Sequence, residues 1–173
     1  MATTSVFQYR YPLSSSTVNV PQDIQNLATD IDYVNSIMAN KDTFSAIGTA
    51  GLAASTSGSY VDITGTTKTF TKIGAAADSD LVISGVSVSG FVSVGNTEFA
   101  VGVNVNGTDR DVTKLNFNAA NQHTPLPPGH VRITGLAAGT ITIKVRAKRN
   151  SGTGTLTVDT GDCVSFVVEE RAI

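Results

Sequence analysis

The sequence predicts a mainly β protein, in which a β-sandwich of the jelly-roll kind is preceded by an extended arm and one amphipathic helix. From residue 59 onward, short runs of alternating apolar and polar residues are separated by Gly, Ser and Thr, as in a two-sheet sandwich. No helical periodicity interrupts them. The first quarter differs, because it holds five of the eleven aromatic residues: Phe7, Tyr9, Tyr11, Tyr33 and Phe44.

Residues 1–20 are expected to form an extended anchoring arm. Period-2 geometry places Phe7, Tyr9 and Tyr11 on one face, and Pro12 then prevents both a longer strand and the start of a helix. A disordered tail is the alternative, since chain ends often lack structure. Three aromatic side chains on one face favour docking on a partner, so these three are the candidate docking residues of the arm.

Residues 21–41 are expected to form a helix that serves as a short stalk between identical chains. Pro21 suits the first turn of a helix, and Asp23 lies near the positive end of its dipole. Apolar residues then recur at spacings of 3, 4, 3 and 4, which is the seam of a coiled coil. The seam residues are Ile24, Leu27, Ile31, Val34 and Met38. A helix packed on its own domain would show the same stripe, and this alternative stays open.

Residues 42–58, rich in small side chains, are expected to form a flexible linker to a knob at 59–173. Within the knob, a long strand is expected over residues 81–94, with a bulge or bend at Gly85 or Gly90. Asn106-Gly107 predicts a hairpin with a type I′ turn. Further strands are expected at 60–63, 68–73, 99–105, 111–117, 131–136, 141–147, 156–158 and 164–168.

Composition excludes several classes of function. The net charge of −2 and the pI near 5.5 provide no basic field, so no nucleic-acid partner is expected. A lone cysteine, Cys163, forms no intrachain disulfide. The N-terminus lacks the pattern of a signal peptide, and no apolar run reaches the roughly 20 residues that span a bilayer. Neither membrane insertion nor classical secretion is therefore expected, and release by cell lysis fits both observations.

The segment YRYPLSSSTVNVPQDIQNLATDIDYV resembles the N-terminal part of bacteriophage minor tail and fibre proteins, with a Tyr-Pro, a spacer, Asn-Val-Pro, Asp-Ile-Gln and Leu-Ala. The segments VNGTDRDVTKLNFN and ITGLAAGTITIKVRAKRNSGTGTLTVDTGDCVSFVVEE look like the C-terminal β-domain of such proteins, whose topology is similar to the trimeric TNF/C1q jelly roll. The resemblance covers nearly the whole chain. It implies a structural component of a phage particle that carries a virion anchor and is homotrimeric. Head fibres and capsid decoration proteins share this layout.

No catalytic motif and no cysteine pair is present, so neither an enzyme nor a cofactor is expected. His123 and His130 flank a Pro-rich loop with the wrong spacing for a helical metal pair. Asp78 with Asp80, and Asp159 with Asp162, could offer oxygen ligands to Ca²⁺, but the preference of Asp for turns explains them without a metal. No metal site is therefore assigned.

A row of three basic residues is the remaining candidate for ligand binding. Lys144, Arg146 and Lys148 alternate with apolar residues and share one face of a strand. In one interpretation these side chains form a solvated outer face. In the other, more specific one, they bind an acidic neighbour or an anionic cell-wall polymer. The absence of Trp weakens a carbohydrate-binding role, because glycan sites usually carry a broad aromatic platform.

These observations favour a homotrimeric phage structural protein, a minor tail or fibre protein that is assembled in the host cytoplasm, lies on the virion and contacts other virion proteins. The alternatives are a capsid decoration or head-fibre protein and a module that binds the host cell surface. The sequence does not choose between tail and capsid.

Overall fold

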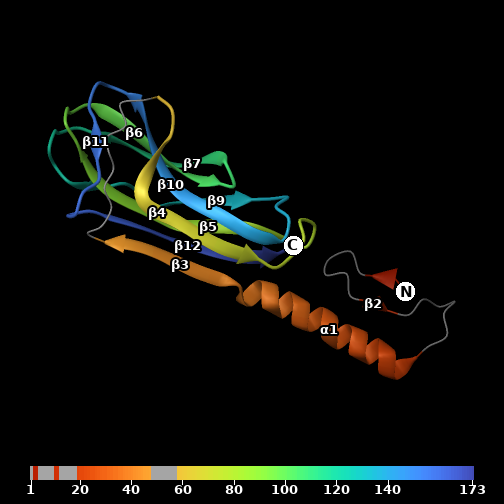
Figure 1. Cartoon of the computed structure of the whole chain (residues 1–173). Coiled ribbons are helices and arrows are strands. Elements are labelled where there is room, and N and C mark those ends of the chain that lie inside the picture. The colour runs from red at the N-terminus through yellow and green to blue at the C-terminus, as the bar shows by residue number, and fades with distance from the viewer. Residues whose placement is uncertain (1, 4–9, 12–18, 48–57) are drawn as a thin grey trace.

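The computed structural model describes residues 2–3, 10–11, 19–47 and 58–173, and it is a two-sheet β-sandwich with one helix, as the sequence predicts (Figure 1). Two short strands, β1 and β2, pair near the N-terminus. The helix α1 follows, and the knob is built from the remaining strands. The bounds are β1 Ala2–Thr3, β2 Arg10–Tyr11, α1 Val20–Ala39, β3 Lys41–Ile47, β4 Val61–Lys72, β5 Ser79–Val92, β6 Thr97–Val105, β7 Thr108–Phe117, β8 Thr124–Pro125, β9 Gly129–Ile133, β10 Gly139–Ser151, β11 Leu156–Thr157 and β12 Cys163–Ala172.

The knob strands pair as a long antiparallel ribbon that is folded over on itself. The hairpin β6–β7 lies at the tip of this ribbon. The antiparallel pairs β5–β9, β4–β10 and β3–β12 follow it in order along the ribbon. Pairing of β10 with β6 and of β12 with β5 closes the ribbon into two sheets. One sheet has the order β4-β10-β6-β7 and the other contains β11-β5-β12-β3. This winding is that of a jelly roll.

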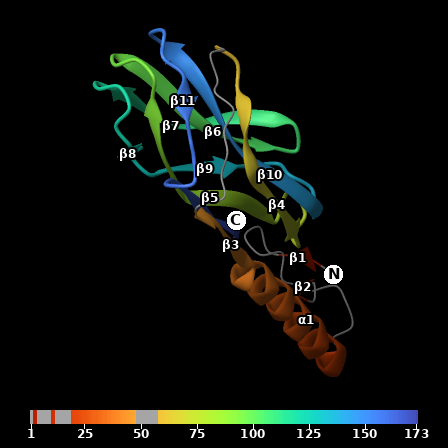
Figure 2. The same ribbon diagram turned by 60° about the vertical axis from the view of Figure 1, so that its left-hand side comes forward.

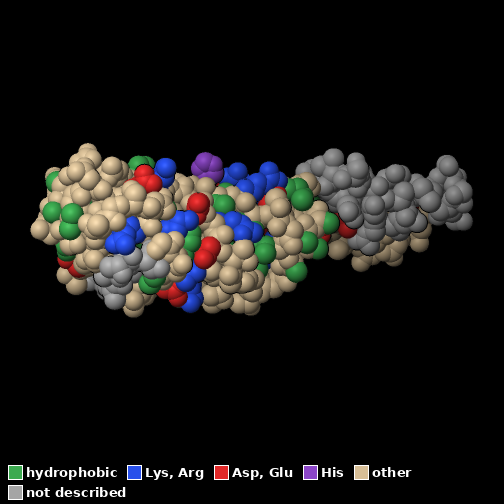
Figure 3. All heavy atoms as spheres, turned by 90° about the horizontal axis from the view of Figure 1, so that it is seen from above, with side chains coloured by type: hydrophobic (Ala, Val, Ile, Leu, Met, Phe, Trp, Pro, Cys, Tyr) green, Lys and Arg blue, Asp and Glu red, His purple; other side chains and the backbone are tan. Residues whose placement is uncertain are grey.

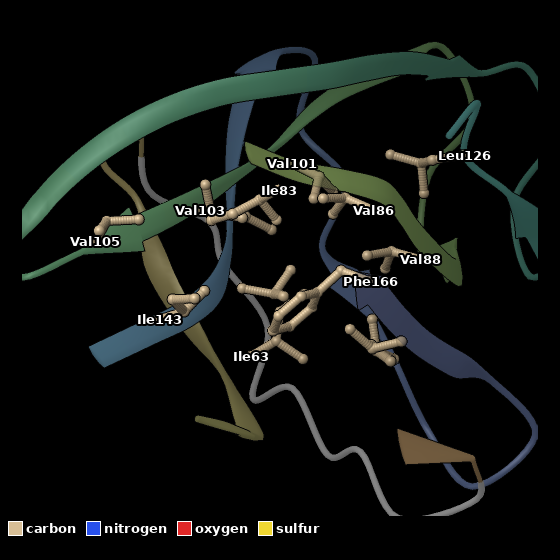
Figure 4. Close-up of a cluster of buried hydrophobic side chains, with 14 of the residues drawn as sticks. Ile63, Ile83, Val86, Val88, Val101, Val103, Val105, Leu126, Ile143 and Phe166 are labelled. Carbon is tan, nitrogen blue, oxygen red and sulfur yellow. The ribbon is translucent and has the colours of Figure 1, made fainter. Parts of the chain in front are cut away.

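The core lies between the two sheets, where strands contribute every second side chain. Figure 4 shows Val101, Val103 and Ile143 from one sheet facing Val88 and Phe166 from the other. Nearly all of these core side chains are aliphatic, so packing and not a disulfide holds the sandwich together.

Turn chemistry explains how the strands are placed. Asn106 and Gly107 have φ angles of 48° and 88°, both positive as a type I′ turn requires, so the predicted hairpin is confirmed. Gly85 has a φ of 59° where the pairing of β5 shifts register, which confirms the expected bulge. A bulge near Gly65 joins the two short strands predicted at 60–63 and 68–73 into the single strand β4.

The linker predicted for residues 42–58 is wrong over its first part. Lys41–Ile47 forms β3, which pairs with β12 along its whole length. Phe44 stacks on the buried Phe166, with 5.1 Å between the ring centroids. This contact supplies the apolar anchor that the small residues around it lack. Residues 48–57 lie outside the described residues.

Helix α1 projects from one end of the sandwich and continues the line of β3 (Figures 1 and 2). Asn19 caps its N-terminus by accepting a hydrogen bond from the backbone N–H of Gln22, at 3.4 Å. Pro21 lies in the first turn, as predicted. Only Asn40 separates the end of the helix from β3, so α1 passes directly into the knob. In the described part of the chain, no helix is both long and apolar enough to cross a membrane.

Candidate oligomerisation interface on helix α1

Helix α1 carries a narrow apolar stripe that is exposed along nearly its whole length. At about 100° per residue, the positions of the stripe fall within an arc of about 60°, and at 1.5 Å per residue they extend over about 27 Å. Charged side chains are absent from this set. Its members are Val20, Ile24, Leu27, Ile31 and Met38, with exposed fractions of 56%, 63%, 41%, 41% and 66%. A stripe this narrow suits a coiled-coil seam better than the broad face of a helix that packs on a globular core.

Four of the five predicted seam residues belong to this stripe, and the fifth does not. Val34 is only 8% exposed and Ile37 only 1%, and Ile37 lies beside Gly74 of the knob of the same chain. Val34 and Ile37 lie about 50° and 110° around the helix from the centre of the stripe. The helix therefore uses one face to dock on its own domain and another to present apolar residues to solvent. Packing of the helix on its own domain, one of the two alternatives left open by the sequence, is thus confirmed for one face, and the seam between chains stays a prediction for the other.

A buried polar cluster, formed by Lys72, Ser79 and Glu170 with the backbone of residues 73–75, lies where α1 meets the knob. The side chains of Lys72 and Glu170 are both fully buried, and their charged atoms lie 3.6 Å apart. Ser79 Oγ donates to Glu170 at 2.5 Å and accepts from Lys72 Nζ at 2.6 Å. The backbone N–H groups of Ile73 and Gly74 donate to the carboxylate at 2.8 and 2.6 Å. The buried ion pair is thus fully hydrogen-bonded, as a buried charge requires.

The end of the helix is tied directly to this cluster. Asn40 Nδ2 donates to Glu170 at 2.7 Å, and the backbone N–H of Glu170 donates to the carbonyl of Asn40 at 2.9 Å. Two turns earlier, Tyr33 OH donates to Asp78 at 2.8 Å and accepts from the backbone N–H of Ala75 at 3.2 Å. Burial, together with the hydrogen bond to Asp78, raises the pKa of Tyr33. These bonds fix the direction in which α1 leaves the knob.

Two opposing effects act on the pKa of Glu170. Burial raises this pKa, but the hydrogen bonds from Ser79, Ile73, Asn40 and Gly74 favour the charged form more strongly, so the pKa lies below its ordinary value. Glu170 is therefore a carboxylate at neutral pH. Sequence reasoning missed it, although a signal was present: Glu170 is in phase with Val164, Phe166 and Val168 and so falls on the core face of its strand.

A surface hollow lies beside the C-terminal end of the stripe. It has a volume of 370 Å³ and is lined by Met38 and by residues 169–172 of β12. Met38 is both the last member of the stripe and one wall of this hollow. The stripe therefore ends beside a hollow whose other wall is formed by the mostly charged end of β12.

The predicted basic row lies on the outer face of β10, where acidic side chains of the same sheet neutralise it. Lys144 Nζ lies 2.8 Å from Asp62, and Arg146 Nη1 lies 2.8 Å from Asp109. The hydrogen bond from Lys144 lowers the pKa of Asp62. Figure 3 shows basic and acidic side chains interspersed over this side of the knob.

The third member of the row, Lys148, is paired in the same way. Its Nζ lies 3.0 Å from Asp111 and 4.3 Å from the centroid of the Tyr60 ring. Hydrogen bonds from Tyr60 and Lys148 lower the pKa of Asp111. The acidic neighbour considered in the sequence analysis is thus supplied by the chain itself, and all three basic side chains are ion-paired. This arrangement weakens the hypothesis of an anionic ligand on this face.

Two of the predicted virion-docking residues, Phe7 and Tyr9, lie outside the described residues. The third, Tyr11, belongs to β2, whose backbone pairs with β1 and lies beside α1 (Figure 1). The docking role of all three stays a prediction.

No family model matches the chain, and neither does any curated protein. Solved structures similar to it include viral capsid proteins and sugar-binding domains. The sugar-binding C-terminal domain of EclA matches with a TM-score of 0.33 and 16% identity, over 77% of this chain and 79% of that chain. A pentameric capsid protein from metagenomic phage sequences matches with a TM-score of 0.35 and 14% identity, over 94% and 82%.

The VP2 subviral particle protein of infectious bursal disease virus matches with a TM-score of 0.43 and 9% identity, over 78% of this chain and 34% of that chain. TM-scores below 0.5 at such low identity carry no functional argument. The interpretation of this chain therefore rests on its own residues and on the resemblance of its sequence segments.

Proposed function

We propose that the chain is a non-enzymatic structural protein of a phage particle, in which three copies associate through α1 and display the jelly-roll knob. The exposed apolar stripe of α1 is the observation that carries this proposal. Full burial of an aliphatic side chain contributes about 1.5–3 kcal/mol, so covering five of them supplies a substantial driving force for association. Most of the stability of a helix in a protein comes from the packing of its apolar face, which makes association with other copies a natural way to cover the stripe.

The rigid junction supports the same proposal. The bonds from Tyr33 and Asn40 to the knob hold α1 in one direction, so little orientational freedom is lost when helices of different chains meet. Ile24 and Ile31 fall at the a positions of the seam, and Ile at these positions is compatible with two or three strands. The number three follows from the resemblance to trimeric jelly rolls.

The outer face of the sheet that contains β3 offers a second contact surface. Ser45, Ser165 and Ser87 lie side by side across β3, β12 and β5. This row is flat and uncharged, in contrast to the ion-paired face of the other sheet. A neighbouring knob could pack on it without burying a charge.

Incorporation of truncated chains into assembled particles tests whether the arm attaches the chain to the particle. A chain that lacks residues 1–18 should form the same oligomer as the full chain but should not join the particle, because truncation of an aromatic interface anchor commonly costs 2 kcal/mol or more. The replacement of Phe7, Tyr9 and Tyr11 by Ala in the full chain is the finer version of the same test. Full incorporation of either variant contradicts the role of the arm.

The position of the chain on the particle is determined with the same preparation of particles. An antibody against residues 59–173 should label assembled particles at one site, and the proposal of a minor tail or fibre protein expects that site on the tail. Labelling of the capsid shell would assign the chain to decoration or head-fibre proteins instead. Absence from purified particles overturns the structural role altogether.

A further inference from the structure

His123, Asp159 and Asp162 come together at one end of the knob from two separate loops. His123 precedes β8, whereas the two aspartates lie in the turn between β11 and β12. The Nδ1 atom of His123 lies 2.9 Å from Asp162 Oδ1, and its Nε2 atom lies 4.0 Å from Asp159 Oδ2. One ligand atom from each residue lies within 4.8 Å of the other two.

The turn presets both carboxylates, because each uses one oxygen to hold the turn and presents the other to the imidazole. Asp162 Oδ2 accepts the backbone N–H of Asp159 at 2.9 Å, while Oδ1 faces His123. Asp159 Oδ1 accepts the backbone N–H of Gly161 at 2.8 Å, while Oδ2 faces His123. The turn therefore places one oxygen of each carboxylate beside the same imidazole, Asp162 at Nδ1 and Asp159 at Nε2, and one ligand atom from each of the three residues lies within 4.8 Å of the others.

Burial and packing distinguish this cluster from a chance surface contact. The side chain of Asp162 is only 1% exposed, whereas those of His123 and Asp159 are 47% and 44% exposed. The cluster thus has a fixed base and a side that is open to water. The ring of Phe91 lies 4.7 Å from the imidazole, centroid to centroid, and restricts its rotation.

Charge balance also favours a cation here. Among the ion pairs of the described residues, neither carboxylate is paired with a Lys or Arg, and His123 is their basic partner. Two carboxylates facing one imidazole leave a net negative site when the imidazole is neutral. A cation at the convergence point would satisfy all three groups at once.

We propose that His123, Asp159 and Asp162 bind one divalent cation of the zinc class, with water completing its coordination, and that the cation links the two loops at this end of the knob. Zinc binds imidazole nitrogen and carboxylate oxygen at about 2.0–2.2 Å, so the donors of a tetrahedral site lie about 3.3–3.6 Å apart. The exposed Asp159 side chain can close the remaining gap by a small rotation. An imidazole ligand favours zinc over Ca²⁺ and Mg²⁺, which prefer oxygen ligands alone.

Calorimetric titration of the full chain with Zn²⁺, after removal of metals with EDTA, tests this proposal. One zinc site per chain is expected, and His123→Ala should weaken its affinity at least tenfold. His130→Ala is the matched control, because His130 is an exposed histidine of β9 that lies outside the cluster. Cys163→Ser excludes the thiol next to Asp162 as the ligand. Both control variants should bind zinc as the original chain does.

Thermal unfolding provides the second readout. Zn²⁺ should raise the midpoint temperature of unfolding of the unmodified chain and of His130→Ala, since a cation that binds only the folded state stabilises that state. The midpoint of His123→Ala should not respond. Asp159→Asn, whose side chain is half exposed, tests a carboxylate ligand without disturbing the buried Asp162. The absence of saturable binding up to 1 mM Zn²⁺, or equal binding by the original chain and His123→Ala, overturns the proposal.

Discussion

The knob and helix α1 differ in the solvent exposure of their large apolar side chains. In the knob, Phe99, Val103 and Ile143 are wholly buried between the two sheets of one chain. On α1, Ile24 and Met38 are more than 60% exposed. The knob therefore buries its apolar side chains within a single chain, whereas the helix leaves a stripe of them in solvent. Under the proposed function, the stripe is covered by helices of other chains, so this difference separates the residues that form the fold from those proposed to form the assembly.

The junction between the two regions gives the largest expected effect on stability. Glu170→Gln leaves Lys72 buried without a counter-charge, so the free energy of unfolding should fall by about 3–5 kcal/mol near neutral pH. Urea denaturation followed by far-UV circular dichroism measures this loss. Glu169→Gln is the matched control, because Glu169 is the preceding residue and faces outward beside Arg171. Its effect should stay below about 1 kcal/mol.

The same pair of variants responds differently to acid. The folded-state pKa of Glu170 is lowered, so its contribution to stability is present above the unfolded-state value of about 4.3 and is lost as the pH falls through the lower folded-state value. The original chain should lose stability in this acid range, and Glu170→Gln should show a shallower loss. A parallel pH dependence of the two chains would mean that the buried carboxylate does not contribute.

A smaller effect is expected in β3, the strand that joins the two regions. Phe44→Ala removes a half-buried ring that stacks on Phe166, and it should lower the free energy of unfolding by about 2 kcal/mol. Thr43→Ala, at the exposed neighbouring position of the same strand, should change it by less than about 0.5 kcal/mol. If both substitutions changed the free energy of unfolding by the same small amount, residues 42–47 would be a loosely attached linker and not a packed strand.

The smallest effect is expected on the ion-paired outer face of the knob. Asp109→Asn removes one of the two acidic partners of Arg146, the other being Asp62. The free energy of unfolding should fall by less than about 1 kcal/mol, because the side chains of Asp109 and Arg146 are both partly exposed. The loss should shrink further at high salt, where such pairs are screened. A loss of several kcal/mol in denaturant titration would show that this face does more than keep the knob soluble.

Strand alternation, the Asn106-Gly107 turn and Pro21 in the first turn made the sandwich and the helix predictable, because each depends on neighbours in the sequence. The edge strand β3 was missed because Phe44 is its only large apolar residue at the positions that face inward. The buried pair was missed because Lys72 and Glu170 are nearly a hundred residues apart and meet only after the sheets form. His123 and Asp162 likewise come from different loops, and no spacing rule connects them.

The mass of the intact chain in solution, measured by multi-angle light scattering, tests most directly whether α1 is an assembly element. We predict a trimer of about 54 kDa, formed by chains of 17.9 kDa each. Ile31→Asp places carboxylates on the apolar seam and should shift the mass toward that of one chain while the knob keeps its β spectrum. Gln25→Asp, which adds the same carboxylate on the opposite side of the helix, should leave the trimer intact. A mass of 17.9 kDa for the unmodified chain would contradict the account.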